Sequence, residues 1–294
     1  MIKHDEFKVK AFDDLKLFVQ SWQAIKQPRA IIFLVHGLGE HSGRFCRMAN
    51  KFAHAGHIFI AFDLRGHGNS SGERGHVQSY DIFMQDITVV LTFIKQKFPK
   101  IPIFLYGHSM GGNLVLNYVL RYHPRIEGVI VTSPWLRLAF EPSAFKLIIS
   151  KTMNRIWPTF SQLSNLDVNA LSRDSKIVND YRKDSVVHSH VSARLFTEIY
   201  KSGRWALEHA SEFSLPLLLM HGGADRITSH EASCEFANQL TNSENCTFKL
   251  WKNLYHEIHN EPEREEVFEF TIHWINTKYY QKIKFGTYQR AIVH

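Results

Sequence analysis

The stretch IPIFLYGHSMGG, residues 101–112, decides the fold of this chain. Its first six residues are mostly apolar, which predicts a strand buried in a parallel sheet, and the residues that follow it have a helical pattern. The G-x-S-x-G between them predicts a nucleophile elbow, a strand-to-helix turn that forces the serine backbone into a strained conformation. Glycines at 107 and 111 would prevent clashes with the strand and the helix. Ser109 is therefore the candidate nucleophile.

The strand signal recurs on both sides of this stretch. Residues 7–12 and 15–22 alternate around Asp13-Asp14, which predicts an antiparallel hairpin at the start of the chain. Buried-strand patterns occupy residues 30–36, 57–62, 101–106, 126–132, 215–221 and 246–251, and helical patterns occupy 45–55, 80–98, 111–122, 231–240 and 262–279. This alternation predicts an α/β fold with an eight-stranded, mostly parallel sheet flanked by helices.

The alternation is interrupted between about Leu136 and Phe213. This segment has no clear buried strand but several helix-like runs rich in Phe, Ile, Trp and Met. We interpret it as a helical cap inserted into one domain, since no repeat or low-complexity linker is visible. The predicted organisation is a core made of residues 1–135 and 214–294, with the cap at 136–213.

The composition is that of a folded globular protein, with 294 residues, 44% hydrophobic and 21% charged. A net charge of +7 mildly favours anionic surfaces, but the basic residues are scattered and no nucleic-acid motif is present, so we expect no nucleic-acid partner. The three cysteines lack metal-type spacing and an even number, which argues against zinc and a disulfide framework. Without a signal-peptide pattern or a run of membrane-spanning length, we expect a cytoplasmic protein.

A serine nucleophile needs a histidine base, which in turn needs a carboxylate to orient it, and the expected chain order is Ser, acid, His. Asp225 ends the sequence HGGAD directly after a predicted strand, which places it at the same sheet edge as Ser109. Asp180 and Asp184 are weaker candidates because they lie in the predicted cap. We therefore assign the acid to Asp225.

The loop after the last predicted strand offers two candidate bases, His256 and His259. His256 lies closer to the end of the strand, so we expect it to be the base. We expect no metal site here, because the spacing is H-E-x-H rather than the zinc-protease H-E-x-x-H and further ligands are lacking. The predicted chemistry requires no cofactor.

Acyl transfer also needs N–H donors for the developing oxyanion. The backbone N–H of Met110, directly after the nucleophile, is the first candidate. The second is the amide of Leu38, in the loop HGLGEHS that follows the strand predicted at 30–36. This loop lacks the third glycine of the dinucleotide pattern G-x-G-x-x-G, so we do not expect a nucleotide cofactor.

These motifs resemble those of the monoacylglycerol lipases and lysophospholipases of the α/β-hydrolase superfamily. The matching segments are HGLGEHSGRF (36–45), DLRGHGNS (63–70), GHSMGG (107–112), HGGAD (221–225) and YHEIHNE (255–261). The resemblance covers most of the chain apart from the cap, and it implies that Glu40, Arg44 and His259 surround the free glycerol hydroxyls. An ion pair between Glu40 and Arg44 that only ties down the loop is an open alternative.

The motifs and the resemblance together predict a serine hydrolase that cleaves the carboxylic ester of monoacylglycerols through an acyl-enzyme. Lysophospholipase and general carboxylesterase are the nearest alternatives, and an aminopeptidase or a non-catalytic ligand-binding receptor on this fold are further ones. The cap would line an acyl pocket with apolar residues such as Phe140, Phe145, Ile148, Ile149, Met153 and Trp157.

Two interpretations of the cap remain open. It contacts a membrane peripherally, with Lys146, Lys151 and Arg155 near the lipid headgroups, or all of its apolar residues face the acyl pocket.

Overall fold

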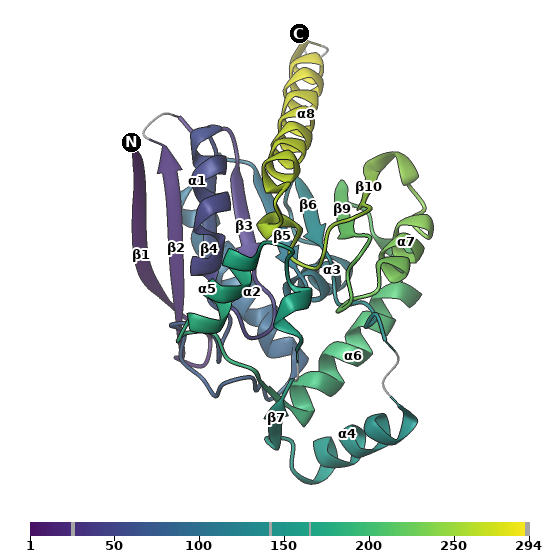
Figure 1. The fold of residues 1–294 in the computed structure, drawn as a ribbon. Coiled ribbons are helices and arrows are strands. Elements are labelled where there is room, and N and C mark those ends of the chain that lie inside the picture. The colour runs from purple at the N-terminus through teal and green to yellow at the C-terminus, as the bar shows by residue number, and fades with distance from the viewer. Residues whose placement is uncertain (25–26, 141–142, 165, 292–294) are drawn as a thin grey trace.

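One mixed sheet organises the chain (Figure 1). The computed structural model describes residues 1–24, 27–140, 143–164 and 166–291, without the side chains of residues 144, 146, 243 and 279–291. The eight strands have the order β1-β2-β4-β3-β5-β6-β9-β10, in which β2 is antiparallel to β1 and β4 and the other neighbours are parallel. The strands are β1 Ile2–Lys10, β2 Lys16–Ala24, β3 Ile31–Val35, β4 Ile58–Phe62, β5 Ile103–His108, β6 Gly128–Thr132, β9 Leu217–Gly222 and β10 Cys246–Trp251. The predicted α/β fold is confirmed.

Helices cover both faces of this sheet. The helices are α1 Cys46–His54, α2 Tyr80–Lys97, α3 Met110–Tyr122, α4 Ala144–Ile156, α5 Ser175–Lys183, α6 Ala193–Glu208, α7 His230–Asn238 and α8 Arg264–Ala291. Buried side chains of α1 and α8 pack on one face, and those of α2, α3, α6 and α7 pack on the other. In the described part of the chain, no helix combines the length and the apolar character that crossing a membrane requires.

Two elements are longer than predicted. β1 begins at Ile2 rather than at residue 7, because its first residues pair with β2 as an edge strand whose side chains are largely polar. α8 continues to Ala291 rather than ending near 279, and Figure 1 shows it projecting beyond the sheet. The predicted end at 279 lies just past Trp274 and Ile275, which are buried against the sheet.

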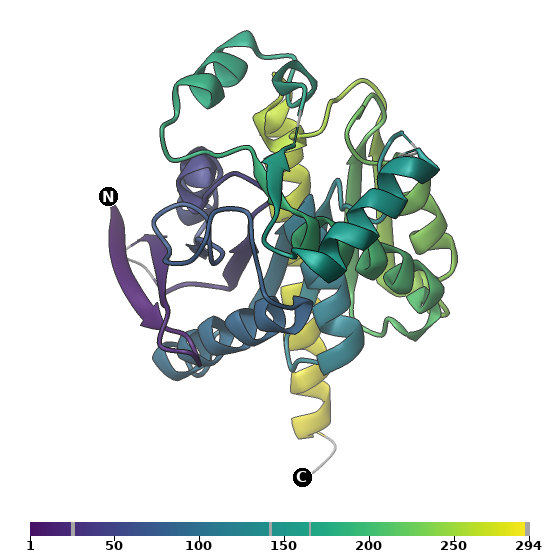
Figure 2. The ribbon, with the colours of Figure 1, turned by 90° about the horizontal axis from the view of Figure 1, so that it is seen from below.

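The segment predicted as a cap is heterogeneous. Its first part carries α4 and a small antiparallel pair, β7 Ser161–Leu163 with β8 His190–Ser192, and Figure 2 views the molecule from the end where α4 lies. Its last helix, α6, instead packs with α3, since Asn113 and Asn117 donate to the carbonyls of Ile199 and Ser202. We propose that residues 136–192 form the cap and that α6 belongs to the core.

The contact between α3 and the sheet leaves no space for a side chain at Gly111. A Cβ there would lie 2.1 Å from the carbonyl oxygen of Val35 and 2.5 Å from that of His36. Both oxygens belong to the backbone at the end of β3, so they cannot rotate away. This approach fixes the start of α3 against the end of β3.

Gly111→Ala is expected to destabilise the protein by about 1–3 kcal/mol or more, because an added methyl group would push α3 off β3. The free energy of unfolding from urea titration measures the effect. Gly43→Ala is the matched control, since its Cβ would meet chiefly the side chain of His41 rather than backbone, so it should cost less. Equal stability of the two variants would contradict the packing argument.

Candidate active site

The serine elbow has the strained backbone that its sequence predicts. Ser109 has a φ of 53° and directly precedes α3. A Cβ on Gly107 would lie 2.5 Å from the carbonyl oxygen of Gly111, so the two glycines let the turn close on itself. The N–H of Ser109 donates to the carbonyl of Thr132 at 3.0 Å, which ties the elbow to the end of β6.

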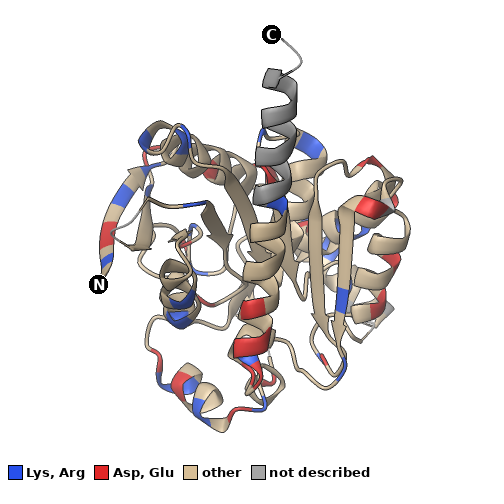
Figure 3. Cartoon of the chain, turned by 90° about the horizontal axis from the view of Figure 1, so that it is seen from above, with Lys and Arg blue, Asp and Glu red and all other residues tan. Residues whose placement is uncertain are grey.

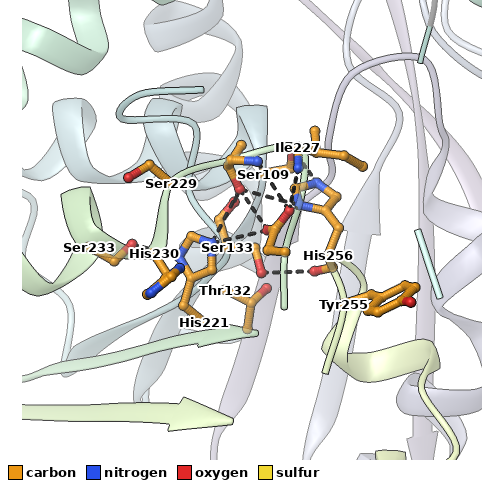
Figure 4. Close-up of polar contacts among 12 residues, drawn as sticks. Ser109, Thr132, Ser133, His221, Ile227, Ser229, His230, Ser233, Tyr255 and His256 are labelled. Carbon is orange, nitrogen blue, oxygen red and sulfur yellow. Dashed lines mark hydrogen bonds and ion pairs between the residues drawn. The ribbon is translucent and has the colours of Figure 1, made fainter. Parts of the chain in front are cut away.

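Three of the predicted residues form one hydrogen-bonded line. Nε2 of His256 lies 2.9 Å from Oγ of Ser109, and its Nδ1 lies 2.7 Å from Oδ2 of Asp225. The three side chains come from the loops after β5, β9 and β10, which end at the same edge of the sheet. Figure 4 shows Ser109 and His256 facing each other. Asp184, the weaker candidate acid, instead pairs with His41.

Asp225 has more partners than the sequence indicated. Its Oδ1 accepts from the backbone N–H groups of Ile227 and Thr228, and its Oδ2 accepts from the Thr228 hydroxyl at 2.9 Å. A second histidine, His221, places Nε2 3.0 Å from the same Oδ2, and Figure 4 shows it on the side away from His256. The only signal for His221 in the sequence is its position at the end of a strand, four residues before the acid.

These contacts set the protonation states of the pair. Burial alone would raise the pKa of Asp225, but His256 and His221 outweigh burial and hold that pKa well below its usual value. Burial alone would lower the pKa of His256, but the charge of Asp225 outweighs it and raises the pKa above 6.5. Asp225 is therefore an anion at neutral pH, positioned to stabilise an imidazolium.

The loop after β3 passes directly beside the nucleophile. A Cβ on Gly37 would lie 3.1 Å from Cβ of Ser109. The N–H of Gly37 donates to Oε1 of Glu40 at 2.7 Å, which leaves Leu38 as the candidate donor of this loop. Met110 is the first residue of α3, where backbone N–H groups have no partner within the helix. Both predicted oxyanion donors thus flank Ser109, and their role stays a prediction.

A cavity of about 650 Å³ opens onto Ser109 and His256, within the size range of small-molecule sites. Its apolar wall combines residues from before, within and after the insertion. The apolar residues that line it include Trp135, Leu138, Phe140, Ile149, Met153, Phe160, Leu163, Leu166 and Phe196. Its polar end carries Glu40 and Arg44, as the resemblance predicts, together with Tyr181, His188 and Glu257.

Glu257 is a residue of the polar end that sequence reasoning missed. Its carboxylate accepts two hydrogen bonds from Arg44, at 2.8 and 2.7 Å, whereas Glu40 lies 3.4 Å from the same guanidinium. The predicted pair of Glu40 and Arg44 therefore exists, but Glu257 is the main partner of the arginine. Its only signal in the sequence is weak, namely an acidic residue directly after the base.

His259 lies near this cluster but apart from the cavity wall. Its ring stacks on Phe45 with centroids 4.6 Å apart, and neither ring nitrogen has a hydrogen-bond partner in the described residues. Burial lowers the pKa of His259 to about 4, so the ring is neutral. Contact between His259 and a substrate hydroxyl stays a prediction.

The insertion holds the loop of the candidate base. The N–H of Glu257 donates to the carbonyl of Leu171 at 2.8 Å. The buried carboxylate of Glu261 accepts from Nε of Arg173 at 2.5 Å and from the N–H of Tyr255 at 3.3 Å. The loop that carries His256 is therefore fixed from the cap side as well as from the sheet.

Comparisons with known proteins show which family the chain resembles. A family model described as serine aminopeptidase, S33, matches residues 26–263. An uncharacterized abhydrolase domain-containing protein of Dictyostelium discoideum is 36% identical over 90% of this chain, which spans 28% of that protein's length. The monoacylglycerol lipase of Mycolicibacterium smegmatis is 30% identical, over 89% of this chain and 93% of its own.

A solved structure extends the likeness to three dimensions. The crystal structure of Paleococcus ferrophilus monoacylglycerol lipase has a TM-score of 0.79 and 30% identity, covering 95% of this chain and 99% of that one. The shared fold and the match of the family model over most of the chain lead to one conclusion. This protein belongs to the serine aminopeptidase S33 family of α/β-hydrolases.

Proposed function

We propose that this serine hydrolase cleaves monoacylglycerols to fatty acid and glycerol. The observation that carries the proposal is the position of Ser109, paired with His256, between an apolar wall and a compact polar end of one cavity. An acyl chain fits the apolar wall, and a small polyol fits the end near Glu40 and Arg44. The names of the relatives from Mycolicibacterium and Paleococcus support the same substrate.

In the proposed reaction, Ser109 attacks the acyl carbonyl while His256 accepts its proton. The amides of Leu38 and Met110 donate to the oxyanion of the tetrahedral intermediate. His256 then protonates the departing glycerol, and the acyl group remains on Ser109 as an ester. A water molecule that His256 deprotonates attacks this ester. The imidazolium then gives the proton to Oγ of Ser109 as the fatty acid leaves, and Asp225 stabilises the imidazolium in both halves.

Part of the cap is proposed to contact a lipid surface. Phe145 and Ile148 of α4 and Ile156 at its end are 72%, 62% and 73% exposed, and they recur at roughly helical spacing on a face that does not line the cavity. Ile149 and Met153 line the cavity instead, so the apolar residues of α4 divide between the two interpretations. Lys151 and Arg155 are exposed on the same helix, and Lys146 lies outside the described side chains.

Ser109→Ala is expected to abolish monoacylglycerol hydrolysis, with a loss of up to ~10⁶-fold in kcat, because the variant lacks the nucleophile. His256→Ala should be nearly as damaging. His259→Ala is the matched control and should be much less damaging, because its ring nitrogens make no hydrogen bond to Ser109, His256 or Asp225 in the described residues. Initial rates on a monoacylglycerol, a simple methyl ester and an aminoacyl amide measure the effect. Wild-type turnover in a folded Ser109→Ala protein would refute the serine mechanism.

The pH profile of kcat/KM should report the coupling between His256 and Asp225. His256 must be neutral to accept a proton, so activity rises with pH through its raised pKa. In Asp225→Asn the charge that raises the pKa of His256 is absent, and burial lowers that pKa. The acidic limb of the kcat/KM profile should therefore move to lower pH, while the maximum of kcat/KM falls by ~10⁴-fold. An acidic limb that keeps its position would show that Asp225 does not set the pKa of the base.

Replacing Phe145 and Ile148 together by Ser should weaken binding to anionic phospholipid vesicles by roughly tenfold or more, because each buried apolar side chain contributes about 1.5–3 kcal/mol. Co-sedimentation at low and high salt measures the binding. Phe12→Ser is the control, since Phe12 is 52% exposed at the far hairpin. If the wild type stays in the supernatant in every condition, the cap is only the roof of the pocket.

A further inference from the structure

The polar end of the cavity contains a cation that is already paired. The guanidinium of Arg44 donates to both oxygens of Glu257, at 2.8 and 2.7 Å, and its NH1 group lies 3.4 Å from Glu40. The face of the guanidinium lies 4.5 Å from the ring of Tyr181. The side chains of Arg44, Glu40 and Glu257 are only 8%, 4% and 2% exposed, so water screens these interactions little.

The other ionisable groups of the wall add no free positive charge. Arg226 lies 3.6 Å from Asp167 at the exposed rim. Burial lowers the pKa of His188 to about 4 and holds the pKa of His108 well below its usual value, so both rings are neutral. The charge of protonated His256 faces Asp225. Among the described residues that line the cavity, none is a cation without an acidic partner.

The two buried carboxylates outnumber the one buried guanidinium. Burial raises the pKa of Glu40 to about 7, while Arg44 overcomes burial to hold the pKa of Glu257 at about 2. With Glu40 ionised the cluster carries a net charge of −1, and with Glu40 protonated it is neutral. In neither state does the cluster offer a positive charge to an anionic group.

A phosphate on the leaving alcohol would enter this end of the cavity. It would meet two acidic side chains and an arginine whose N–H groups already donate to Glu257. Like charges in contact within a poorly hydrated site repel strongly. A neutral glycerol finds hydrogen-bond acceptors there, and because it has no charge the cluster does not repel it in either state of Glu40. The same geometry that accepts the polyol therefore rejects the phosphate.

We propose that Glu257 is a specificity-determining residue: by occupying the fork of Arg44, it makes the site cleave neutral glycerol esters and reject lysophospholipids with anionic headgroups. The inference rests on the proposed function and deepens it, since it separates the two nearest substrate classes. Its basis is the bidentate contact between Glu257 and Arg44 in the wall of the cavity beside Ser109.

The test compares 1-oleoylglycerol with 1-oleoyl lysophosphatidic acid in neutral detergent micelles, because the two share the acyl chain and differ in the phosphate. Wild-type protein should prefer the neutral ester by ~100-fold or more in kcat/KM. Glu257→Gln keeps the side-chain volume and removes the negative charge, so Arg44 loses its main acidic partner. The ratio of kcat/KM for the neutral ester to that for the anionic ester should then fall by roughly tenfold or more. Adding Arg44→Met to this variant should abolish the increase in kcat/KM for the anionic ester, because the released cation is then absent.

The rate of Ser109 labelling by a fluorophosphonate reports an intact site in each variant. A wild-type kcat/KM for the anionic ester within a few-fold of that for the neutral one would overturn the inference, whether or not the variants fold. Equal losses on both esters in a well-labelled Glu257→Gln protein would also overturn it. If the wild type is labelled and cleaves p-nitrophenyl butyrate but not 1-oleoylglycerol, the proposed function itself fails, and this inference fails with it.

Discussion

The close approach of α3 to the end of β3 is the constraint on which the site depends. Gly111 has no space for a side chain next to the carbonyls of Val35 and His36, and the elbow can hold Ser109 at a positive φ only in this tight arrangement. Parallel strands bring the loops after β3, β5, β9 and β10 to one edge. The position of the elbow therefore decides what the other three loops can reach.

Buried charge is balanced separately on the two sides of the base. Asp225 and Glu257 are both nearly inaccessible carboxylates, and each is paired with a cationic or basic partner and with further donors. Removing one member of such a pair leaves the other charge buried without compensation, so a one-sided change in either pair costs stability. Because Glu257 directly follows His256 in the chain, the pair with Arg44 also restrains the backbone of the base.

The sequence was sufficient for features that local chemistry determines. The elbow, the buried strands and the loops with Asp225 and His256 are short segments whose residue types follow from sterics and burial, and their proximity follows from a parallel sheet. Features that depend on distant partners were not predictable. Glu257 looks like any acidic loop residue until Arg44, 213 positions away, is placed beside it. α6 has a helical pattern, and its proposed place in the core rests on its contact with Asn113 and Asn117.

The net charge of the whole chain is positive, whereas that of the polar end of the cavity is negative or zero. The net charge is +7, and in the view of Figure 3 the Lys and Arg residues are spread over many elements. Such a surface attracts anionic lipid at long range, where potentials from many residues add. Inside the cavity, distances of a few ångströms and burial make three residues, Glu40, Arg44 and Glu257, decisive. The proposed attraction to anionic lipid and the proposed preference for a neutral ester are therefore compatible, because the two selections act through different residues and at different ranges.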